Sequence, residues 1–173
     1  MLPDLNVIET GRLNLREMSE ADAGFVLELL NDADFKRNVG DRGVRTLEDA
    51  GAYVSERFEG SYRRHGFGLW LVETKHGRTP AGICGLVKRD ALPGIDIGYA
   101  FLPAFRAKGY AYESASAVMR HAREVLGLGR LYAVVNPDNA GSIRVLEKLG
   151  MRFERMFRFS GEEAEVKLFS ADL

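Results

Sequence analysis

The amino-acid sequence predicts an α/β fold in which one mixed sheet is flanked by helices, with the element order β-α-α-β-β-β-α-β-α-β-β. Short alternating apolar runs predict the strands, and apolar residues spaced by three and four predict the helices. A strand–helix–strand unit in the second half predicts a parallel crossover, whereas short turns elsewhere predict antiparallel neighbours. Because we find no internal repeat or linker, residues 1–173 are expected to form a single domain.

The first half of the chain predicts one strand and two helices. The strand covers residues 13–16, and a capping box at Ser19 predicts the start of the first helix. The glycine-rich, charged segment 38–45 predicts a loop. A second capping box at Thr46 begins a longer helix, which is expected to end at Gly66 because glycine favours the left-handed conformation after a helix.

The second half predicts three antiparallel strands, then the crossover, then a terminal hairpin. The spacing of apolar residues places the long helix directly after a basic turn. The expected strands cover residues 68–74, 81–88, 95–101, 131–135, 153–159 and 163–169, and the expected helices cover 111–126 and 140–149.

Composition and charge exclude several classes of protein. With 46% hydrophobic and 28% charged residues, the chain is typical of a soluble globular protein. The formal net charge of −1 argues against nucleic acid or an anionic membrane as a partner. No apolar run approaches ~18 residues and no signal peptide is recognised, so we expect a cytoplasmic protein. The single cysteine, Cys84, lies in an apolar strand and is expected to be a buried, inert thiol.

The turn before the long helix predicts an anion site. Between Phe105 and Ala111 there is no Ser, Thr, Asp or Asn to cap the free N–H groups of the helix. Gly109 permits a positive φ or close approach of a ligand, while Arg106 and Lys108 add charge, so a phosphate is the expected partner. The alternative is a basic turn whose N–H groups are bonded to water.

Two motifs at the ends of the crossover resemble coenzyme A signatures. The first is Arg106-x-x-Gly109-x-Ala111, and the second is Asn136-x-x-Asn139-x-x-Ser142 followed by residues 145–151. Together with the element order they are similar to the GNAT superfamily of N-acetyltransferases. The opening residues 9–16 and the strand 96–99 resemble the branch that contains the Rim-type ribosomal-protein N-terminal acetyltransferases, in which Glu often stands where this chain has Asp96.

The resemblance implies an enzyme that moves an acetyl group from acetyl-CoA to a primary amine by direct attack in a ternary complex. The acceptor is expected to be a small molecule or a protein N-terminus, and the protein a monomer or a homodimer. A non-catalytic acyl-CoA-binding regulatory domain is the alternative. The residues expected to bind the cofactor are Tyr99, Ala100, Phe101, Arg106, Ala107, Lys108, Gly109, Tyr110, Ala111, Asn136, Asn139 and Ser142.

Acetyl transfer requires a hydrogen-bond donor that stabilises the oxyanion of the tetrahedral intermediate, and a proton donor for the leaving sulfur. We expect a backbone N–H near Tyr99 or Ala100 to meet the thioester carbonyl, provided that the two parallel strands splay apart. The Ser142 hydroxyl is the expected donor near the sulfur, although Ser142 also suits a bond to backbone at the helix start. The phenols of Tyr99, Tyr110, Tyr112 and Tyr132 compete with it.

Asp96 is the expected proton acceptor. Its strand position places it on the same face as the small residues Gly98 and Ala100, which leaves room for a ligand and water. The carboxylate is short, so a water is expected to carry the proton; the alternative is a strand carboxylate bonded to a neighbouring loop. Asn136 and Asn139 are assigned to the pantetheine amides or, alternatively, to a turn and a helix cap.

The loop 38–45, the second helix and the terminal hairpin are expected to form the acceptor groove. Their charged residues have both signs, so no acceptor charge is predicted. The three histidines share no ligand spacing, and we therefore expect no metal site.

Overall fold

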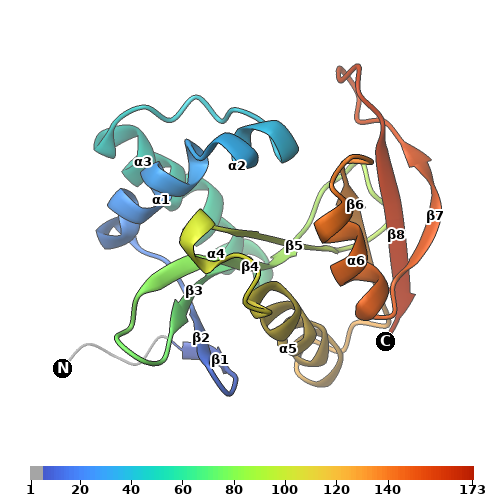
Figure 1. The fold of residues 1–173 in the computed structure, drawn as a ribbon, viewed down its shortest axis with the longest axis horizontal. Helices are drawn as coiled ribbons and strands as arrows, with labels where there is room; N and C mark the ends of the chain where they lie inside the picture. The colour runs from blue at the N-terminus through green and yellow to red at the C-terminus, as the bar shows by residue number, and fades with distance from the viewer. Residues whose placement is uncertain (1–5) are drawn as a thin grey trace.

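The computed structural model describes residues 6–173, whose eight strands form one sheet of order β1-β2-β3-β4-β5-β6-β8-β7 (Figure 1). Neighbouring strands are antiparallel except β5 and β6, which are parallel as the crossover predicted. The strands are β1 (Asn6–Glu9), β2 (Leu13–Arg16), β3 (Leu69–Thr74), β4 (Pro80–Val87), β5 (Asp96–Phe101), β6 (Arg130–Val135), β7 (Arg152–Phe157) and β8 (Val166–Asp172).

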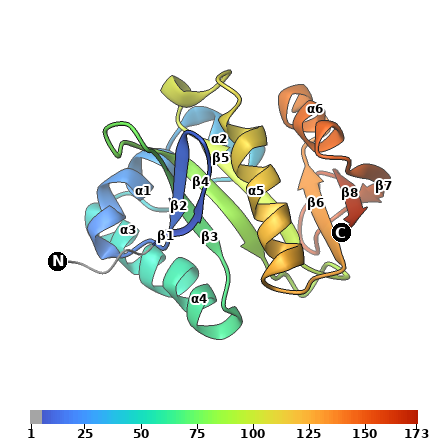
Figure 2. The ribbon, with the colours of Figure 1, turned by 90° about the horizontal axis from the view of Figure 1, so that it is seen from below.

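Helices cover both faces of the sheet, so strand residues alternate between two apolar clusters. Trp70 and Cys84 pack in the cluster that includes α5 and α6, while their neighbours Leu71 and Ile83 pack in the cluster of α1–α4 (Figure 2). The helices are α1 (Ala23–Leu30), α2 (Ala33–Asn38), α3 (Leu47–Tyr53), α4 (Gly60–His65), α5 (Tyr110–Glu124) and α6 (Ala140–Lys148), with short 3₁₀ turns at Glu20–Asp22 and Pro103–Phe105. None of the helices within residues 6–173 is long and apolar enough to cross a membrane.

The α/β fold class is confirmed, but the predicted element order was incomplete near the N-terminus. It lacked β1, whose sequence Asn-Val-Ile-Glu does not alternate between apolar and polar residues and which is held by pairing with β2. It also lacked α2, a six-residue helix capped by the Asp32 side chain, which accepts from the Phe35 N–H. Both capping boxes are present, at Ser19 and at Thr46.

The second predicted helix is continuous from Leu47 to His65 but contains a π-helical segment, Val54–Glu59. This segment changes which side chains share a face. Tyr53 and Phe58 are five residues apart, a spacing that does not share a face on an α-helix, yet their rings meet edge to face with centroids 5.4 Å apart. Gly66 ends the helix with a φ of 74°, as its position predicted.

The parallel strands β5 and β6 diverge. Within the described residues they pair at one register position, Asp96 with Tyr132, where the Tyr132 N–H donates to the Ile95 carbonyl at 3.0 Å. Toward Phe101 the two strands have no further pairing. The splay on which the oxyanion assignment depends is therefore present, and it leaves backbone groups of β5 without a hydrogen-bonding strand on the β6 side.

Candidate active site

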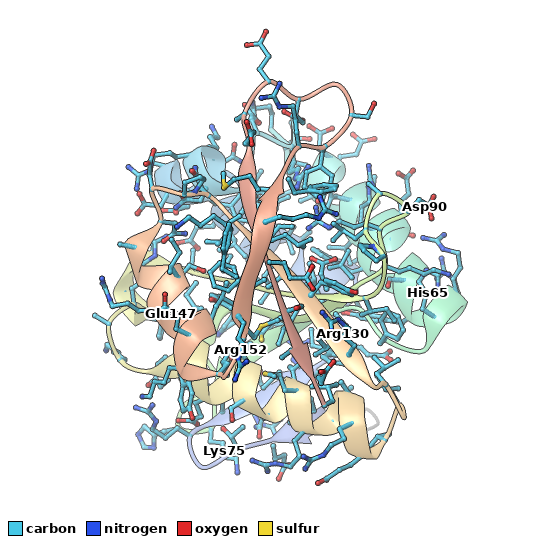
Figure 3. The ribbon with its side chains drawn as sticks, turned by 90° about the vertical axis from the view of Figure 1, so that its right-hand side faces the viewer. His65, Lys75, Asp90, Arg130, Glu147 and Arg152 are labelled. Carbon is cyan, nitrogen blue, oxygen red and sulfur yellow. The ribbon has the colours of Figure 1, made fainter. Side chains whose placement is uncertain are left out.

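A cleft of about 680 Å³ opens where β5 and β6 diverge. Residues 96–100 of β5 line it. Ile97 and Tyr99 pack in the cluster that includes α5 and α6 while Ala100 packs in the cluster of α1–α4, so Asp96, Gly98 and Ala100 share the face that the sequence assigned to them. Its walls come from the loop 38–42, from Tyr53 and Phe58 of the second helix, and from the β7–β8 hairpin. Figure 1 places the α1–α3 group and the hairpin on opposite sides of β5 and β6, and in Figure 3 the hairpin projects beyond the sheet. All three segments predicted to form the acceptor groove therefore line one cleft.

The turn before α5 has the uncapped geometry that the sequence predicted. Gly109 is the N-cap residue with a φ of 82°, and no side chain caps the helix there. Ala107 also has a positive φ, 59°, which is uncommon for a residue with a Cβ. The free N–H groups of the first turn and the partial positive charge of the helix start suit an anion.

Arg106 does not face this turn. Its guanidinium bonds Asp32 and Asp34, and its Nε donates to the Phe101 carbonyl at 2.9 Å. Burial would raise the pKa of Asp32, but the hydrogen bonds from Arg106 and from the Phe35 amide lower it below its usual value. Arg106 therefore ties α2 to the end of β5, while the Lys108 side chain is exposed.

A second cation lies at the α5 start, and the sequence reasoning missed it. The Arg12 guanidinium lies 4.6 Å from the Tyr110 ring centroid and 2.7 Å from a Glu113 carboxylate oxygen. One of its nitrogens is 3.3 Å from the place that a Cβ on Gly109 would take. No local pattern signals this contact, because Arg12 and Gly109 are distant in sequence.

Tyr99 and Ser142 meet at the other side of the cleft. Their hydroxyl oxygens lie 2.8 Å apart, and the Tyr99 hydroxyl also donates to the Ser142 carbonyl at 3.2 Å. Burial raises the pKa of Tyr99 to about 12. The competing phenol rings instead pack against cations, as Tyr110 does with Arg12, Tyr112 with Lys148 and Tyr132 with Arg130.

Both asparagines have local structural contacts. The Asn139 side chain accepts from the Ser142 N–H at 3.2 Å and caps α6, and the Asn136 side chain accepts from the Asp138 N–H at 3.4 Å. These are the cap and the turn that the sequence left as alternatives. Asn136 also lines the cleft, whereas Asn139 is not among its lining residues.

The hydrogen-bond ladder decides which β5 amide faces the opening. Leu102 donates to the Ala81 carbonyl on β4 at 2.9 Å, and Ile95 accepts from β6. Because bonding directions alternate along an antiparallel strand, the N–H of Ala100 points to β4 and the N–H of Tyr99 points toward β6. Tyr99 lies beyond the single β5–β6 pair, so its N–H faces the diverging region.

Asp96 is a buried carboxylate with an imperfect partner. Its side chain is 1% exposed, and its Oδ1 lies 3.3 Å from the Arg89 Nε. Within the described residues neither atom has a hydrogen bond of good geometry, so the attraction is mainly Coulombic. Burial raises the pKa of Asp96 to about 6, although Arg89 acts to lower it. Arg89 belongs to the β4–β5 loop, so the predicted alternative of a loop partner is also observed.

Two further side-chain expectations concern sulfur and metals. Cys84 is fully buried, and burial raises the pKa of its thiol to about 12, which agrees with an inert thiol. Among residues 6–173 no cluster of three or more His, Cys, Asp or Glu side chains is arranged to hold a metal ion. The absence of a metal in the reaction remains a prediction.

Comparisons with known proteins identify the family. A model described as "Acetyltransferase (GNAT) domain" matches residues 12–152. A Bacillus subtilis protein, Uncharacterized N-acetyltransferase YnaD, is 30% identical over 87% of this chain and 85% of its own. A GNAT-family acetyltransferase from Bacillus anthracis superposes with a TM-score of 0.80 at 27% identity, covering 95% of this chain and 97% of its own.

A structure titled RimL ribosomal L7/L12 alpha-N-protein acetyltransferase in complex with coenzyme A has a TM-score of 0.78 over 95% of this chain and 96% of its own. Its identity is 18%, so this likeness to a Rim-type enzyme is one of fold. The family model covers most of the chain, including both predicted coenzyme A motifs up to residue 151, and the Bacillus subtilis relative matches 87% of the chain. The chain therefore belongs to the GNAT acetyltransferase family and is an N-acetyltransferase.

Proposed function

We propose that this protein transfers an acetyl group from acetyl-CoA directly to a primary amine while both substrates occupy the cleft. The observations that carry the proposal are the cleft that opens where β5 and β6 diverge and the uncapped start of α5, the helix that follows β5 and packs against it. One cleft thereby combines a free strand amide, the Tyr99–Ser142 pair and the buried Asp96. Donor and acceptor can then meet without a covalent enzyme intermediate.

The cofactor pyrophosphate is assigned to the backbone N–H groups of residues 107–111. The positive φ values of Ala107 and Gly109 shape this turn, and backbone donors at a helix start bind phosphate without a particular side chain. Lys108 and Arg12 supply positive charge nearby. Arg106 contributes indirectly, because its bonds to Asp32 and Asp34 hold the turn before α5 in position. The pantetheine arm is assigned to the gap between β5 and β6, next to Asn136.

The Tyr99 N–H is assigned to the thioester carbonyl. A backbone donor that is already fixed and points into a partly dry cleft stabilises an oxyanion without reorganising. Ala100 is excluded from this task because its own N–H pairs with β4. Ala100 and Phe101 instead form the strand surface along which the cofactor lies.

The Tyr99 hydroxyl is assigned to the leaving sulfur as a hydrogen-bond donor. An ordinary thiol has a pKa of about 8.5, whereas burial raises the pKa of Tyr99 to about 12. Complete proton transfer to the thiolate is therefore uphill by about 5 kcal/mol, but a hydrogen bond to the sulfur is favourable. Ser142 orients the phenol through the 2.8 Å contact, and the released thiolate takes its proton from solvent.

Asp96 is assigned to the amine proton. With a pKa of about 6, the carboxyl is ionised in roughly ten of eleven molecules at pH 7. Asp96 and Tyr99 are separated by about 10 Å along an extended strand, so a water must carry the proton. A lysine-like amine is neutral in roughly one of 2,500 molecules at pH 7 and an α-amine in about one of seven, so both acceptor types gain from a base.

Acetyl-CoA consumption measured against a panel of amines tests this proposal. Small amines and peptides with free N-termini are compared, and free thiol is followed as each is added. Thiol release that depends on the amine, together with an acetylated product, is the expected result. Acetyl-CoA binding without thiol release for any amine would instead identify a regulatory acyl-CoA-binding domain.

A further inference from the structure

Arg89 has no role in the reaction described so far, yet it contacts two parts of the cleft. It lies in the loop between β4 and β5, and its side chain is 35% exposed. Its Nε lies 3.3 Å from the Asp96 carboxylate, and its guanidinium carbon lies 5.5 Å from the ring centroid of Phe159. Phe159 belongs to the segment that joins β7 to β8, and all three residues line the cleft.

A buried carboxylate that must accept a proton needs a nearby cation. Burial of a carboxyl group favours its neutral, protonated form, and this form cannot accept a proton from an ammonium group. A cation that is too tightly bonded would make the carboxylate a poor base, because strong pairing favours the ionised form too much. The loose 3.3 Å contact between Arg89 and Asp96 lies between these two situations.

We propose that Arg89 is a positioning residue for the reaction: it holds Asp96 as a carboxylate and joins it, through Phe159, to the hairpin wall of the acceptor cleft. This inference rests on the proposed function of Asp96. The acceptor ammonium gives one proton through a water to Asp96, which leaves a neutral amine. This amine forms the C–N bond to the thioester carbon, the C–S bond breaks, and the second proton of the nitrogen passes to solvent, which in turn protonates the released thiolate. The Asp96 carboxylic acid returns its proton to solvent after the products leave.

Among the described residues 6–173, the surroundings of Asp96 offer no other strong charge for this task. On the neighbouring strands its register partners are Val87 and Tyr132, and its face of β5 continues with Gly98. The remaining charged residues of the cleft are Asp41, Arg42 and Glu162, which are exposed on the loop and on the hairpin. Among the groups that act on the Asp96 pKa, Arg89 is the charged one.

The guanidinium suits this double contact better than an ammonium group. Its planar face can lie over the Phe159 ring while its edge faces a carboxylate. A lysine at the same position keeps the charge but loses the planar contact. Charge and hairpin position are therefore separable by substitution.

The test uses Arg89→Gln, Arg89→Lys and Phe159→Leu, with Arg42→Gln as the matched control for loss of an arginine that lines the same cleft. The Asp96 carboxyl pKa is measured by carbon-13 NMR titration and assigned with Asp96→Asn. Arg89→Gln should raise this pKa by about one unit, since the Coulombic support is lost. Arg89→Lys should leave it within about 0.3 unit of the parent, and Arg42→Gln should not change it.

The pH dependence of kcat/KM gives the second readout. A one-unit rise in the Asp96 pKa shifts the acid limb of Arg89→Gln, so that at pH 6 its kcat/KM, relative to its own high-pH plateau, is about fivefold below that of the parent. The plateau itself should fall severalfold, as in Arg89→Lys, because Arg89→Gln also loses the contact with Phe159. Arg89→Lys and Phe159→Leu should keep the acid limb of the parent but raise KM for the amine severalfold, because the hairpin wall loses its anchor. A residue with a purely structural role would lower kcat/KM equally at every pH.

An unmoved Asp96 pKa in Arg89→Gln overturns the inference about Arg89. If Arg89→Gln does not fold, the test uses Arg89→Lys and Phe159→Leu instead. An unchanged KM for the amine in both of these variants overturns the inference. A different result would contradict the proposed function itself: the apparent pKa from the acid limb of kcat/KM in the parent protein differs from the Asp96 pKa measured by NMR. That mismatch needs no Arg89 variant, and it contradicts the assignment of Asp96 as the base.

Discussion

The hydroxyl groups of Tyr99 and Ser142 lie 2.8 Å apart, which joins the middle of β5 to the first turn of α6. The two residues are separated by the whole β5–α5–β6 crossover, so the contact depends on how that unit packs. It places a buried phenol with a raised pKa beside the region where the strands diverge. On this geometry we propose Tyr99, rather than another tyrosine, as the group that meets the leaving sulfur.

Tyr99→Phe should lower kcat roughly 10- to 100-fold, because a hydrogen bond to a charged group contributes about 1.5–3 kcal/mol. Ser142→Ala removes only the orienting contact and should cost less, about two- to tenfold. The double variant should match Tyr99→Phe, since both substitutions act on one hydrogen bond. Steady-state kinetics with saturating amine measures all three; a larger loss in Ser142→Ala than in Tyr99→Phe would reverse the assigned roles.

Asp96→Asn should lower turnover by roughly 10²–10⁴-fold with little change in acetyl-CoA binding, as expected for loss of a general base. Asp90→Asn is the matched control, because Asp90 lies in the β4–β5 loop that leads to Asp96 but is exposed (Figure 3). The parent kcat/KM should rise with pH through about 6, the pKa of Asp96. Turnover of Asp96→Asn within a few-fold of the parent at neutral pH would exclude Asp96 as the base.

The same substitution should stabilise the protein at neutral pH. The pKa of Asp96 is raised from 3.8 to about 6, so the native state binds a proton more tightly than the unfolded chain, and stability is lost as pH rises between these values. Above pH 6 the loss amounts to about 3 kcal/mol. Asn resembles the protonated acid, so Asp96→Asn should be more stable than the parent in urea at pH 7.5. The difference should largely vanish near pH 4; an advantage independent of pH would contradict this origin.

Acetyl-CoA should raise the Tm, because a ligand bound only by the native state stabilises it by mass action, about 2.7 kcal/mol at 100 times Kd. Gly109→Ala should reduce this increase, since its Cβ changes a backbone that has a φ of 82° and approaches Arg12. Gly127→Ala imposes similar strain at a φ of 67°, away from the cleft, with nothing within 4 Å of the added Cβ. Both variants should have a lower Tm without ligand, but Gly127→Ala should keep the full acetyl-CoA increase. Equal increases in both would exclude this turn from the cofactor site.

Substitution of Arg106 should mainly lower the free energy of unfolding, whereas substitution of Lys108 should mainly weaken acetyl-CoA binding. Arg106→Gln removes the partner of Asp32 and Asp34 and should lower the free energy of unfolding by about 1–2 kcal/mol, a value reduced for partial solvent exposure. Lys108→Gln should leave stability unchanged and weaken acetyl-CoA binding a few-fold, because the Lys108 side chain is exposed. Urea unfolding and calorimetric titration measure the two effects. A stability loss in Lys108→Gln, or none in Arg106→Gln, would contradict this division.

Local patterns predicted most of the scaffold. The capping boxes at Ser19 and Thr46, the glycine stop at Gly66 and the crossover around α5 all depend on residues within a few positions of each other. β1 was missed although β2 is equally short, because its sequence Asn-Val-Ile-Glu lacks the alternation that identified β2. The π-helical segment was also missed, because a residue inserted into a helical turn leaves no recognisable periodicity in the sequence.

The sequence by itself determined the uncapped basic turn at Gly109, because the lack of a capping side chain is a property of six consecutive residues. It also determined that Asp96 shares a strand face with Gly98 and Ala100, which follows from the two-residue period of a strand. Only the tertiary structure decided that Arg106 bonds Asp32 and Asp34, and that Arg89 faces Asp96. Partners and burial across the fold depend on how distant segments pack, and burial is what raises the pKa values of Tyr99 and Asp96.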